Sequence, residues 1–568
     1  MKRRSLRKRK GIALIVVFVL VMLVSLAAYR FSFEMQSEYR LAKLYEEQLL
    51  ARQAANSGIE QACSLLDAPL AMRIDLVGSQ ETRTDTEITP FLGFIASSDS
   101  IEAASGPADT PWRYVLISPL STLGNTPGER DNRQSVSPSS SGRSATEPLA
   151  NTWRFGFENE SAKIPIQLLR EWERTRPGHA KKVLSRIPGL DPETIDPWLI
   201  QAGILVPGPV SSMTGAPLSS GLDRNAVQSI NGLSSGSSAI SADRGLFAAQ
   251  WLGGDLNQNY QIEAIEQRWW DKRNRASSGQ GLPVASSVTE PIAMQRYFTK
   301  YSASRNERSD GGPRIDINVM DLRVLHRDLM GIWPQQLADF VIAMRQYGPS
   351  GNPTRSTASS RSGTSIPSGE SVGTPDWGAP SRYQFRSLLD LVDASIRIPG
   401  PAGTPNSQTK TIASPFISGN GDNSNYLVRL LDDCSIDRSA YYEGRIDIWD
   451  APWEVLMAIP SMDDATATRI VTARSDASTK VQSAGTIAWL LQRSIVTLEK
   501  ARQLEPFITA RSDVYSVQVV GYREERSPVF RYTMTIDGCQ RPSKPQDLKT
   551  WHAWDAGFNL ASFDENRN

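Results

Sequence analysis

Two short acidic stretches hold the residues best suited to bind a cation. Asp422-Asn-Ser-Asn425 and Asp432-Asp-Cys-Ser-Ile-Asp437 offer carboxylate and amide oxygens, the hard ligands that Ca²⁺ prefers. Neither stretch ends in the Glu that closes an EF-hand loop, and solvated loop carboxylates are the commoner use of such residues. The sequence therefore predicts no cofactor, and leaves Ca²⁺ open as a ligand of these two stretches.

Side chains that could carry covalent or metal chemistry are few and scattered. The three histidines, His179, His326 and His552, lack the spacing of metal ligands, and neither an HExxH motif nor a P-loop occurs. Three cysteines cannot form a disulfide framework, although Cys434 and Cys539 could pair in an oxidising compartment. The sequence leaves that pairing open. These observations argue against an enzyme.

The N-terminus combines a basic leader with a long apolar stretch. Seven Lys or Arg residues lie in the first ten positions, Gly11 follows, and residues 12–28 are apolar apart from one serine. Apolar residues then recur near a 3.6-residue period up to Leu66, and no proline occurs before Pro69. At about 1.5 Å per residue, a helix over 12–66 is roughly 80 Å long, whereas a bilayer core needs about 30 Å. The pattern predicts a helix that spans a membrane and continues as an amphipathic stem.

Two plainer interpretations share parts of this pattern. A secretory signal peptide also has basic and apolar parts, but it should end at a small-residue cleavage site, and this chain continues through Tyr29, Arg30 and Phe31. A simple single-pass anchor with a basic cytoplasmic end is compatible with the positive-inside rule. Without the leader, 55 Lys and Arg stand against 61 Asp and Glu, a net charge of about −6. A nucleic-acid-binding head should instead carry a basic surplus.

This N-terminus resembles those of the type IV pilins and of the pseudopilins of type II secretion. In these families a prepilin peptidase cuts after the Gly of the leader, and the resemblance places the cut between Gly11 and Ile12. The fifth residue of the mature chain is usually a Glu that neutralises the amino terminus of a neighbouring subunit, because an isolated charge in a bilayer is costly. In this sequence it is Val16. The K-type minor pseudopilins of type II secretion habitually lack the Glu, and they are the long members of the family.

The rest of the chain alternates between repeated modules and spacers. Residues 314–325 and 445–456 both begin Arg-Ile-Asp-Ile, and each is followed by a helical pattern that ends near an arginine, Arg345 or Arg474. A fainter third copy begins at Lys163. Such repeats indicate duplicated supersecondary units. Four stretches rich in Ser, Gly, Pro and Thr are predicted to be loops or disordered insertions, namely 121–150, 207–241, 348–380 and 400–425.

The repeated units resemble helix-hairpin-helix and SAM-like modules, many of which bind DNA. Such hairpins offer glycine-freed backbone N–H groups to a phosphate, but here the turn after Pro460 lacks glycine and carries Asp463 and Asp464. Residues 445–511 hold eight basic and eight acidic residues, so counterion release would drive little binding. The modules are therefore expected to be packing units. The K-type pseudopilins carry such a helical insertion inside a pilin-like sheet.

The expected fold is α+β, with a long N-terminal transmembrane and stem helix, a pilin-like antiparallel sheet and a large inserted SAM-like or helix-hairpin-helix domain. Alternating strands are predicted at 112–117, 153–157, 514–522 and 529–536, on both sides of the insertion. The predicted organisation is a leader at 1–11, the transmembrane and stem helix at 12–66, the first half of the sheet at 67–160, the helical domain with flexible insertions at 161–508, and the last strands and tail at 509–568.

The resemblance implies a minor pseudopilin that caps the tip of the type II pseudopilus and is needed to export folded proteins from the periplasm across the outer membrane. It implies a single-pass inner-membrane protein with a cytoplasmic N-terminus and a periplasmic head. The implied partners are other minor and major pseudopilins, the inner-membrane secretion platform, the prepilin peptidase and the inner membrane, without nucleic acid. Two alternatives stay open: a minor pilin of a type IV or competence pilus, and a single-pass periplasmic anchor whose SAM-like modules bind another protein.

Overall fold

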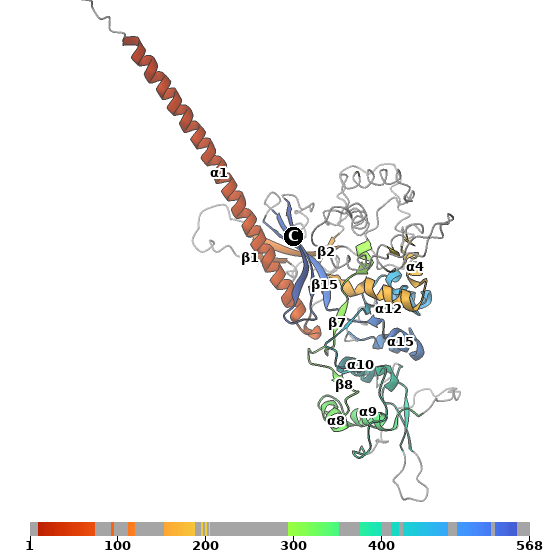
Figure 1. Ribbon diagram of the computed structural model, residues 1–568. Coiled ribbons are helices and arrows are strands. Elements are labelled where there is room, and N and C mark those ends of the chain that lie inside the picture. Colours follow the sequence, from red (N-terminus) through yellow and green to blue (C-terminus); the bar gives the residue numbers. More distant parts are fainter. Residues whose placement is uncertain are drawn as a thin grey trace, which may run out of the picture.

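A computed structural model shows a long helix joined to a mixed helical and β-sheet head (Figure 1). The residues that the structure describes are 10–73, 76, 92–95, 112–119, 153–187, 195–196, 199–200, 204, 268, 294–350, 375–398, 410–419, 424–474, 485–523 and 529–553. The predicted spacers at 121–150 and 207–241 lie outside these ranges, as do most of the leader and part of the other two spacers.

The predicted N-terminal helix is confirmed as α1, Lys10–Asp67. Leu, Ala, Glu and Gln dominate its second half, and these are strong helix formers. Pro69 lies two residues after its end, where proline cannot continue a helix. Residues 14–43 are exposed all round, and the helix projects from the head as a free rod whose last turns lie against the sheet (Figure 1).

The sheet is antiparallel and is built from both ends of the chain, as predicted. Its strands run in the order β1 (Leu92–Ile95), β2 (Trp112–Pro119), β15 (Val514–Tyr522), β16 (Val529–Asp537) and β17 (Lys544–Ala553). Two short strands complete it, because β3 (Trp153–Phe155) pairs with β2 and β4 (Glu158–Asn159) pairs with β15. The central pairing sets Val115 opposite Val520. Everything between β4 and β15 is therefore an insertion between neighbouring strands of one sheet.

Short parallel bridges close three successive units of this insertion. The Arg-Ile-Asp-Ile repeats open two of them: β8 (Ile315–Asp316) pairs with β11 (Cys434–Ser435), and β13 (Ile446–Asp447) pairs with β14 (Ile508–Thr509). In the faint third copy β5 (Ile164–Pro165) pairs with β6 (Phe298–Thr299), again in parallel. The sequence revealed the repeated motif at which two of these units begin, but neither that the motif pairs as a strand nor where the closing strands lie, because each of these strands is a two-residue segment without a hydrophobic period.

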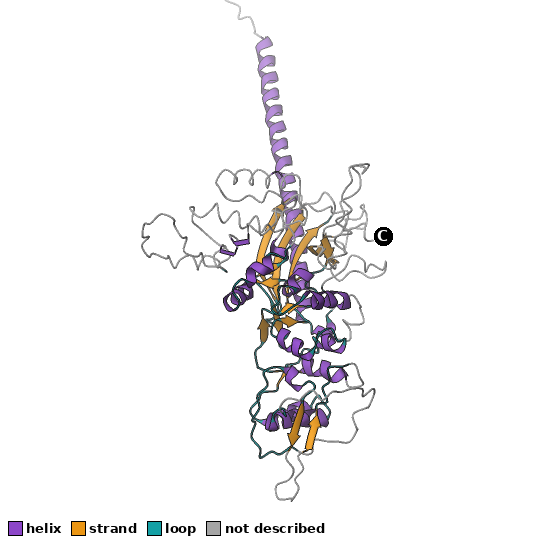
Figure 2. Ribbon diagram, turned by 90° about the vertical axis from the view of Figure 1, so that its right-hand side faces the viewer, coloured by secondary structure: helices purple, strands orange, loops and turns teal. Residues whose placement is uncertain are grey.

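Helices fill the loops that these bridges close. They are α3 (Ile166–Thr175) and α4 (His179–Leu184) in the first unit, α8 (Leu322–Met330), α9 (Gln335–Tyr347) and α10 (Ser424–Asp433) in the second, and α11 (Trp453–Leu456), α12 (Asp464–Arg474), α14 (Ala488–Gln492) and α15 (Leu498–Leu504) in the third. Strands β7 (Ala303–Arg305) and β12 (Tyr441–Glu443) pair antiparallel between the units. The second unit lies farthest from the sheet, so the head is elongated (Figure 2).

One prediction about the spacers is wrong in detail. Residues 400–425 were expected to be a loop, yet β10 (Lys410–Ala413) lies within them and pairs antiparallel with β9 (Ser395–Ile398). The reason is that Ile412 and Ile396 face each other in the register and are both buried, which gives this short segment an apolar face. Four residues with one buried side chain carry too little periodicity to stand out in a Ser/Thr-rich background.

Two separate hydrophobic cores hold the molecule together. The smaller one lies between the last turns of α1 and the sheet, and includes Tyr114, Val519 and Phe530. The larger one runs through the helical units and includes Phe340 and Trp489. The head thus consists of a helix-on-sheet layer that continues the rod and a helical layer that extends away from it.

Candidate functional site

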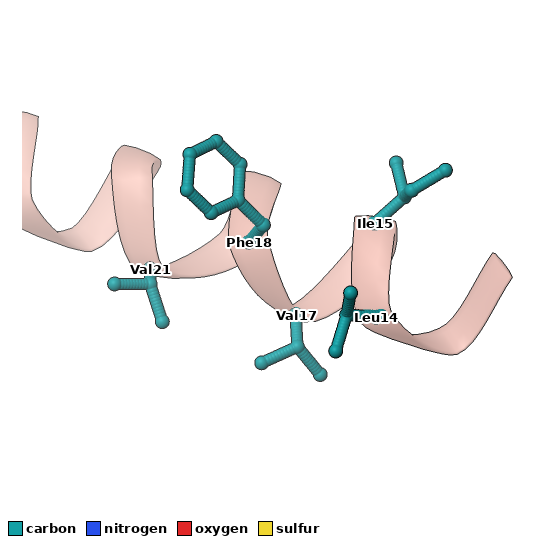
Figure 3. A pocket seen from close by; sticks show the side chains of 5 residues that line it. All are labelled: Leu14, Ile15, Val17, Phe18 and Val21. Atoms are coloured by element: carbon teal, nitrogen blue, oxygen red, sulfur yellow. The ribbon is translucent and has the colours of Figure 1, made fainter. Parts of the chain in front are cut away.

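The exposed half of α1 is the part of the molecule whose sequence predicts an interaction. Within the described residues α1 is the one helix long and apolar enough to cross a membrane, with a mean hydropathy of 2.5 over its most apolar 18-residue window. Leu14, Val17, Phe18 and Val21 project from one side of it without a polar group among them (Figure 3). The head does not cover this surface, since none of that window is buried. It is suited to lipid or to another apolar helix.

The two residues predicted at the processing site, Gly11 and Ile12, and the position of the missing glutamate, Val16, all lie on this helix. Gly11 and Ile12 fall in the first turn of α1, and the side chain of Ile12 lies outside the described part of the chain. Val16 is on the exposed surface, with 57% of its area accessible. The structure therefore places an uncovered apolar side chain at the position where the families that this N-terminus resembles usually carry a Glu.

The opposite end of α1 lies on the sheet through small residues. Ala51, Ala55 and Ala62 are buried on one face of the helix, and Gly58 lies among them. A Cβ atom added to Gly521 of β15 would lie 2.1 Å from the carbonyl oxygen of Ala51, so the two backbones touch. The sequence analysis followed Leu and Phe along this helix and missed this face, although its small residues recur at spacings of three and four.

A buried charged cluster fixes the end of α1 to the rest of the head. Arg73 donates from Nη2 to Asp513 Oδ1 at 2.7 Å, and the Arg305 backbone N–H donates to Asp513 Oδ2 at 2.7 Å. Nη2 of each arginine also donates to the carbonyl of Leu66 in α1, at 2.9 and 3.1 Å. Arg305 Nε donates in addition to the carbonyl of Gly538. One carboxylate thus links the helix end, the start of β15 and the helical insertion.

The pKa values of the two arginines in this cluster shift in opposite directions. Burial lowers the pKa of Arg305, and the nearby Asp513 offsets this only in part. Burial also acts to lower the pKa of Arg73, but the charge and hydrogen bond of Asp513 together with Tyr515 and Glu307 outweigh it, so the pKa of Arg73 is raised. Both side chains of the Arg73–Asp513 pair are 5% exposed. Because a buried ion that loses its partner is strongly destabilising, Asp513 is the residue on which the cluster depends.

A second buried network joins the sheet to the first helical unit. Lys163 Nζ lies 2.7 Å from Glu160 Oε1 and 3.0 Å from Glu158 Oε2. Glu160 also accepts from the hydroxyls of Ser516, at 2.5 Å, and Thr299. Burial acts to lower the pKa of Lys163, but the two glutamates outweigh it and raise that pKa. Strands β4, β5, β6 and β15 therefore meet around one charged lysine.

The arginines noted in the repeats have equivalent structural roles. Arg345, near the end of α9, donates from Nη2 to the carbonyl of Val319 at 2.9 Å. Arg474, at the end of α12, donates from Nη1 to the carbonyl of Ala451 at 2.6 Å. Burial lowers the pKa of both guanidinium groups. Each arginine thus binds the loop that follows the opening strand of its own unit, and neither is presented to a phosphate.

The candidate Ca²⁺ ligands are separated by the fold. Asp422 and Asn423 lie outside the described residues, and Asn425 is in α10. The other stretch gives each carboxylate a partner of its own: Asp432 accepts from Arg511, Asp433 from Trp333 and Asp437 from Tyr442. In the part of the chain that the structure describes, no three His, Cys, Asp or Glu side chains are grouped to hold a metal ion.

Another pair of carboxylates, which the sequence analysis did not single out, binds an amide. Asn159 of β4 donates from Nδ2 to Asp447 Oδ2 at 2.8 Å and to Asp450 Oδ2 at 2.6 Å. Asp447 belongs to the opening strand β13, so the contact attaches the third helical unit to the sheet. In the sequence, this contact is indicated only by the aspartate of the repeated Arg-Ile-Asp-Ile. The sequence alone does not show that this aspartate binds Asn159.

The three cysteines are not paired, and two of the three histidines have polar contacts within the head. Cys63, Cys434 and Cys539 are free thiols, and burial raises the pKa of the Cys434 thiol. His179 lies 2.9 Å from the carbonyl of Ala458, and His326 Nε2 lies 2.8 Å from Asp339 Oδ1. Both contacts lie within the helical units, which supports a structural role for these two histidines.

No family model, curated protein or solved structure matches this chain. The function is therefore inferred from its residues and their geometry.

Proposed function

We propose that this chain is a minor pseudopilin of a type II secretion system, of the long K type, and that it caps the tip of the pseudopilus. The observation that carries the proposal is the continuity of α1, which is bare and apolar in its first half and packs on an antiparallel sheet in its last turns. A plain membrane anchor needs about 20 residues, whereas α1 has 58.

The shape of the head supports a position at the end of a filament. The helical units extend the head away from the rod, beyond the sheet (Figure 1). A subunit with such a head would block the stacking of another subunit above it, so it would be assembled first. Val16 agrees with this position, because a subunit with nothing above it has no neighbouring amino terminus to neutralise.

The helical units serve in this proposal as SAM-like packing modules within a pilin-like sheet. Arg345 and Arg474 are occupied by backbone carbonyls, which supports a structural role for them. The head would then lie in the periplasm, contact other pseudopilins and the secretion platform, and take part in the export of folded proteins across the outer membrane. No bound cofactor enters the proposal.

Processing of the leader tests the proposal. N-terminal sequencing of the protein purified from membranes should begin at Ile12, and Gly11→Leu should leave the leader attached, because the peptidase must accommodate a Gly at the junction. Lys10→Ala, which changes a neighbouring residue but keeps the junction, should still be cut. A mature chain that starts at Met1 would favour the single-pass anchor, and a cut beyond Ala28 would identify a signal peptide; either result excludes the pseudopilin.

A further inference from the structure

One line of residues on α1, all apolar except Glu38, continues past the bilayer and faces away from the head. Its positions alternate at spacings of four and three, the heptad pattern of a left-handed coiled coil. We call this line the seam, and its residues are Val17, Val21, Val24, Ala28, Phe31, Met35, Glu38, Ala42, Tyr45 and Leu49. A bilayer core accounts for about the first 20 residues of the mature helix, so the seam extends well beyond it.

The seam is uncovered along its length. Phe31, Met35, Tyr45 and Leu49 are each more than half accessible, from 51% to 68%. On an ideal helix Ala51, which packs on the sheet, points about 160° away from Leu49. The head therefore lies mainly on the other side of α1 and first reaches the line of the seam beyond Leu49, at Arg52, which donates to the Tyr532 hydroxyl and lies over the Phe530 ring. The next two heptad positions, Arg52 and Asn56, are polar, so the seam ends where the head begins.

Acidic residues of α1 lie in or beside the seam, whereas the basic residues of the same segment lie elsewhere on the helix. Glu38 lies within the seam, and Glu34 and Glu46 take the positions directly beside it. The basic residues of the same segment, Arg30, Arg40 and Lys43, all fall outside these positions. In a parallel pair of identical chains Glu38 would face Glu38 inside an apolar interface, which is unfavourable. The seam is thus apolar enough to bind a helix and too acidic to bind its own copy.

We propose that the seam binds a membrane-spanning helix of a different protein, whose own apolar seam is flanked by Lys or Arg residues opposite Glu34, Glu38 and Glu46. The partner must span the membrane, because the first half of the seam lies in the apolar segment of α1. This inference deepens the proposed function by specifying the charge and position of the neighbouring helix. It requires only α1, and so it is tested separately from the processing of the leader.

A charge-reversed copy of the chain can replace the unknown partner in the test. Full-length native chain and the variant Glu34→Lys, Glu38→Lys and Glu46→Lys are placed together in phosphatidylcholine vesicles. Both carry Cys63→Ser and Ala42→Cys, and tags of different mass separate the cross-linked products. Oxidation should yield the mixed dimer at least about tenfold above either homodimer, and added salt should reduce it.

Two matched controls define the surface. Lys43→Cys in place of Ala42→Cys puts the thiol just outside the seam and should not cross-link. Reversal of Glu47 and Glu60 in place of the three seam acids should not promote the mixed dimer, because Glu47 lies off the seam and Glu60 lies beyond its end. Equal yields of native homodimer and mixed dimer, or no mixed dimer, would overturn the proposal. N-terminal sequencing of the native chain, expressed without the substitutions, decides on processing independently.

Discussion

At the scale of single residues, buried charges connect the end of α1, the sheet and the helical insertion. Asp513 receives hydrogen bonds from Arg73 and Arg305, which both also bind the last turn of α1. Buried ion pairs seldom stabilise a protein more than apolar residues would, but the loss of one partner leaves an uncompensated charge. Sensitivity to mutation is therefore expected to concentrate at Asp513.

Replacement of Asp513 by Ala should lower the free energy of unfolding by about 3–5 kcal/mol, because two buried guanidinium groups lose their carboxylate. Asp196→Ala is the matched control. Asp196 pairs with Lys181 at 2.8 Å, but both side chains are about half exposed, at 50% and 56%. Its loss should cost about 0–1 kcal/mol. Urea denaturation of the full chain in detergent measures both values, and equal effects would show that the buried cluster has no special role.

At the scale of elements, the contact between the α1 rod and the head depends on glycines, which have no side chain. Gly521 allows the backbone of α1 to contact β15, and Gly58 leaves room for the side chain of Val519, which would lie 2.5 Å from a Cβ at that position. Small residues at such a contact let a helix approach a sheet more closely than Leu or Val would. The direction in which the rod leaves the head is therefore sensitive to single methyl groups.

Gly521→Ala should destabilise the protein by about 1–3 kcal/mol, since the new methyl group meets backbone atoms of Ala51 and Ala55 that cannot move aside by a rotamer change. Gly419→Ala is the control, because a Cβ there meets nothing within 4 Å. Thermal unfolding followed by circular dichroism compares the two. An unchanged midpoint for Gly521→Ala would mean that helix and sheet are less tightly apposed in solution.

At the scale of the whole molecule, the chain separates a bare apolar helix surface from a head. Among the described residues, the head contacts α1 along the last turns of the helix, where the small residues and the Asp513 cluster lie. The insertion can therefore be large without disturbing the sheet, because both of its ends return to neighbouring strands, β4 and β15. This arrangement suits a subunit that assembles by its rod and ends a filament with its head.

The proposed position at the tip predicts the effect of Val16→Glu. If no earlier subunit offers its amino terminus, the new carboxylate stays unpaired, and its insertion into the membrane should cost up to about 3 kcal/mol. Assembly should then show no gain in filament number or length. Electron microscopy measures the filament yield. Cross-linking from positions in the stem region, residues 44–59, to neighbouring subunits measures their packing. Longer or more abundant filaments would place this chain inside the filament and exclude the cap. Val16→Leu is the control, and it should leave assembly unchanged.

The sequence by itself determined the features that depend on neighbouring residues. The apolar run, the later helical period and the first proline at Pro69 predicted α1 to within two residues at either end. Alternation predicted the strands β2, β15 and β16, although not β17, and the repeated Arg-Ile-Asp-Ile predicted two of the units. These signals are local, because hydrophobic periodicity and duplication can be read along one segment.

Only the tertiary structure decided which distant residues meet. The closing strands β6, β11 and β14 are two residues long and take their conformation from the partner strand. The contact between Gly521 and Ala51, and the cluster around Asp513, join segments more than 200 residues apart, and no local pattern encodes such a pairing. The same holds for the direction of the seam, since a heptad shows that one side of α1 is apolar but not that the head occupies the other. Local sequence determines the conformation of a segment. The packing of the whole chain determines which residues contact a buried charge or a glycine.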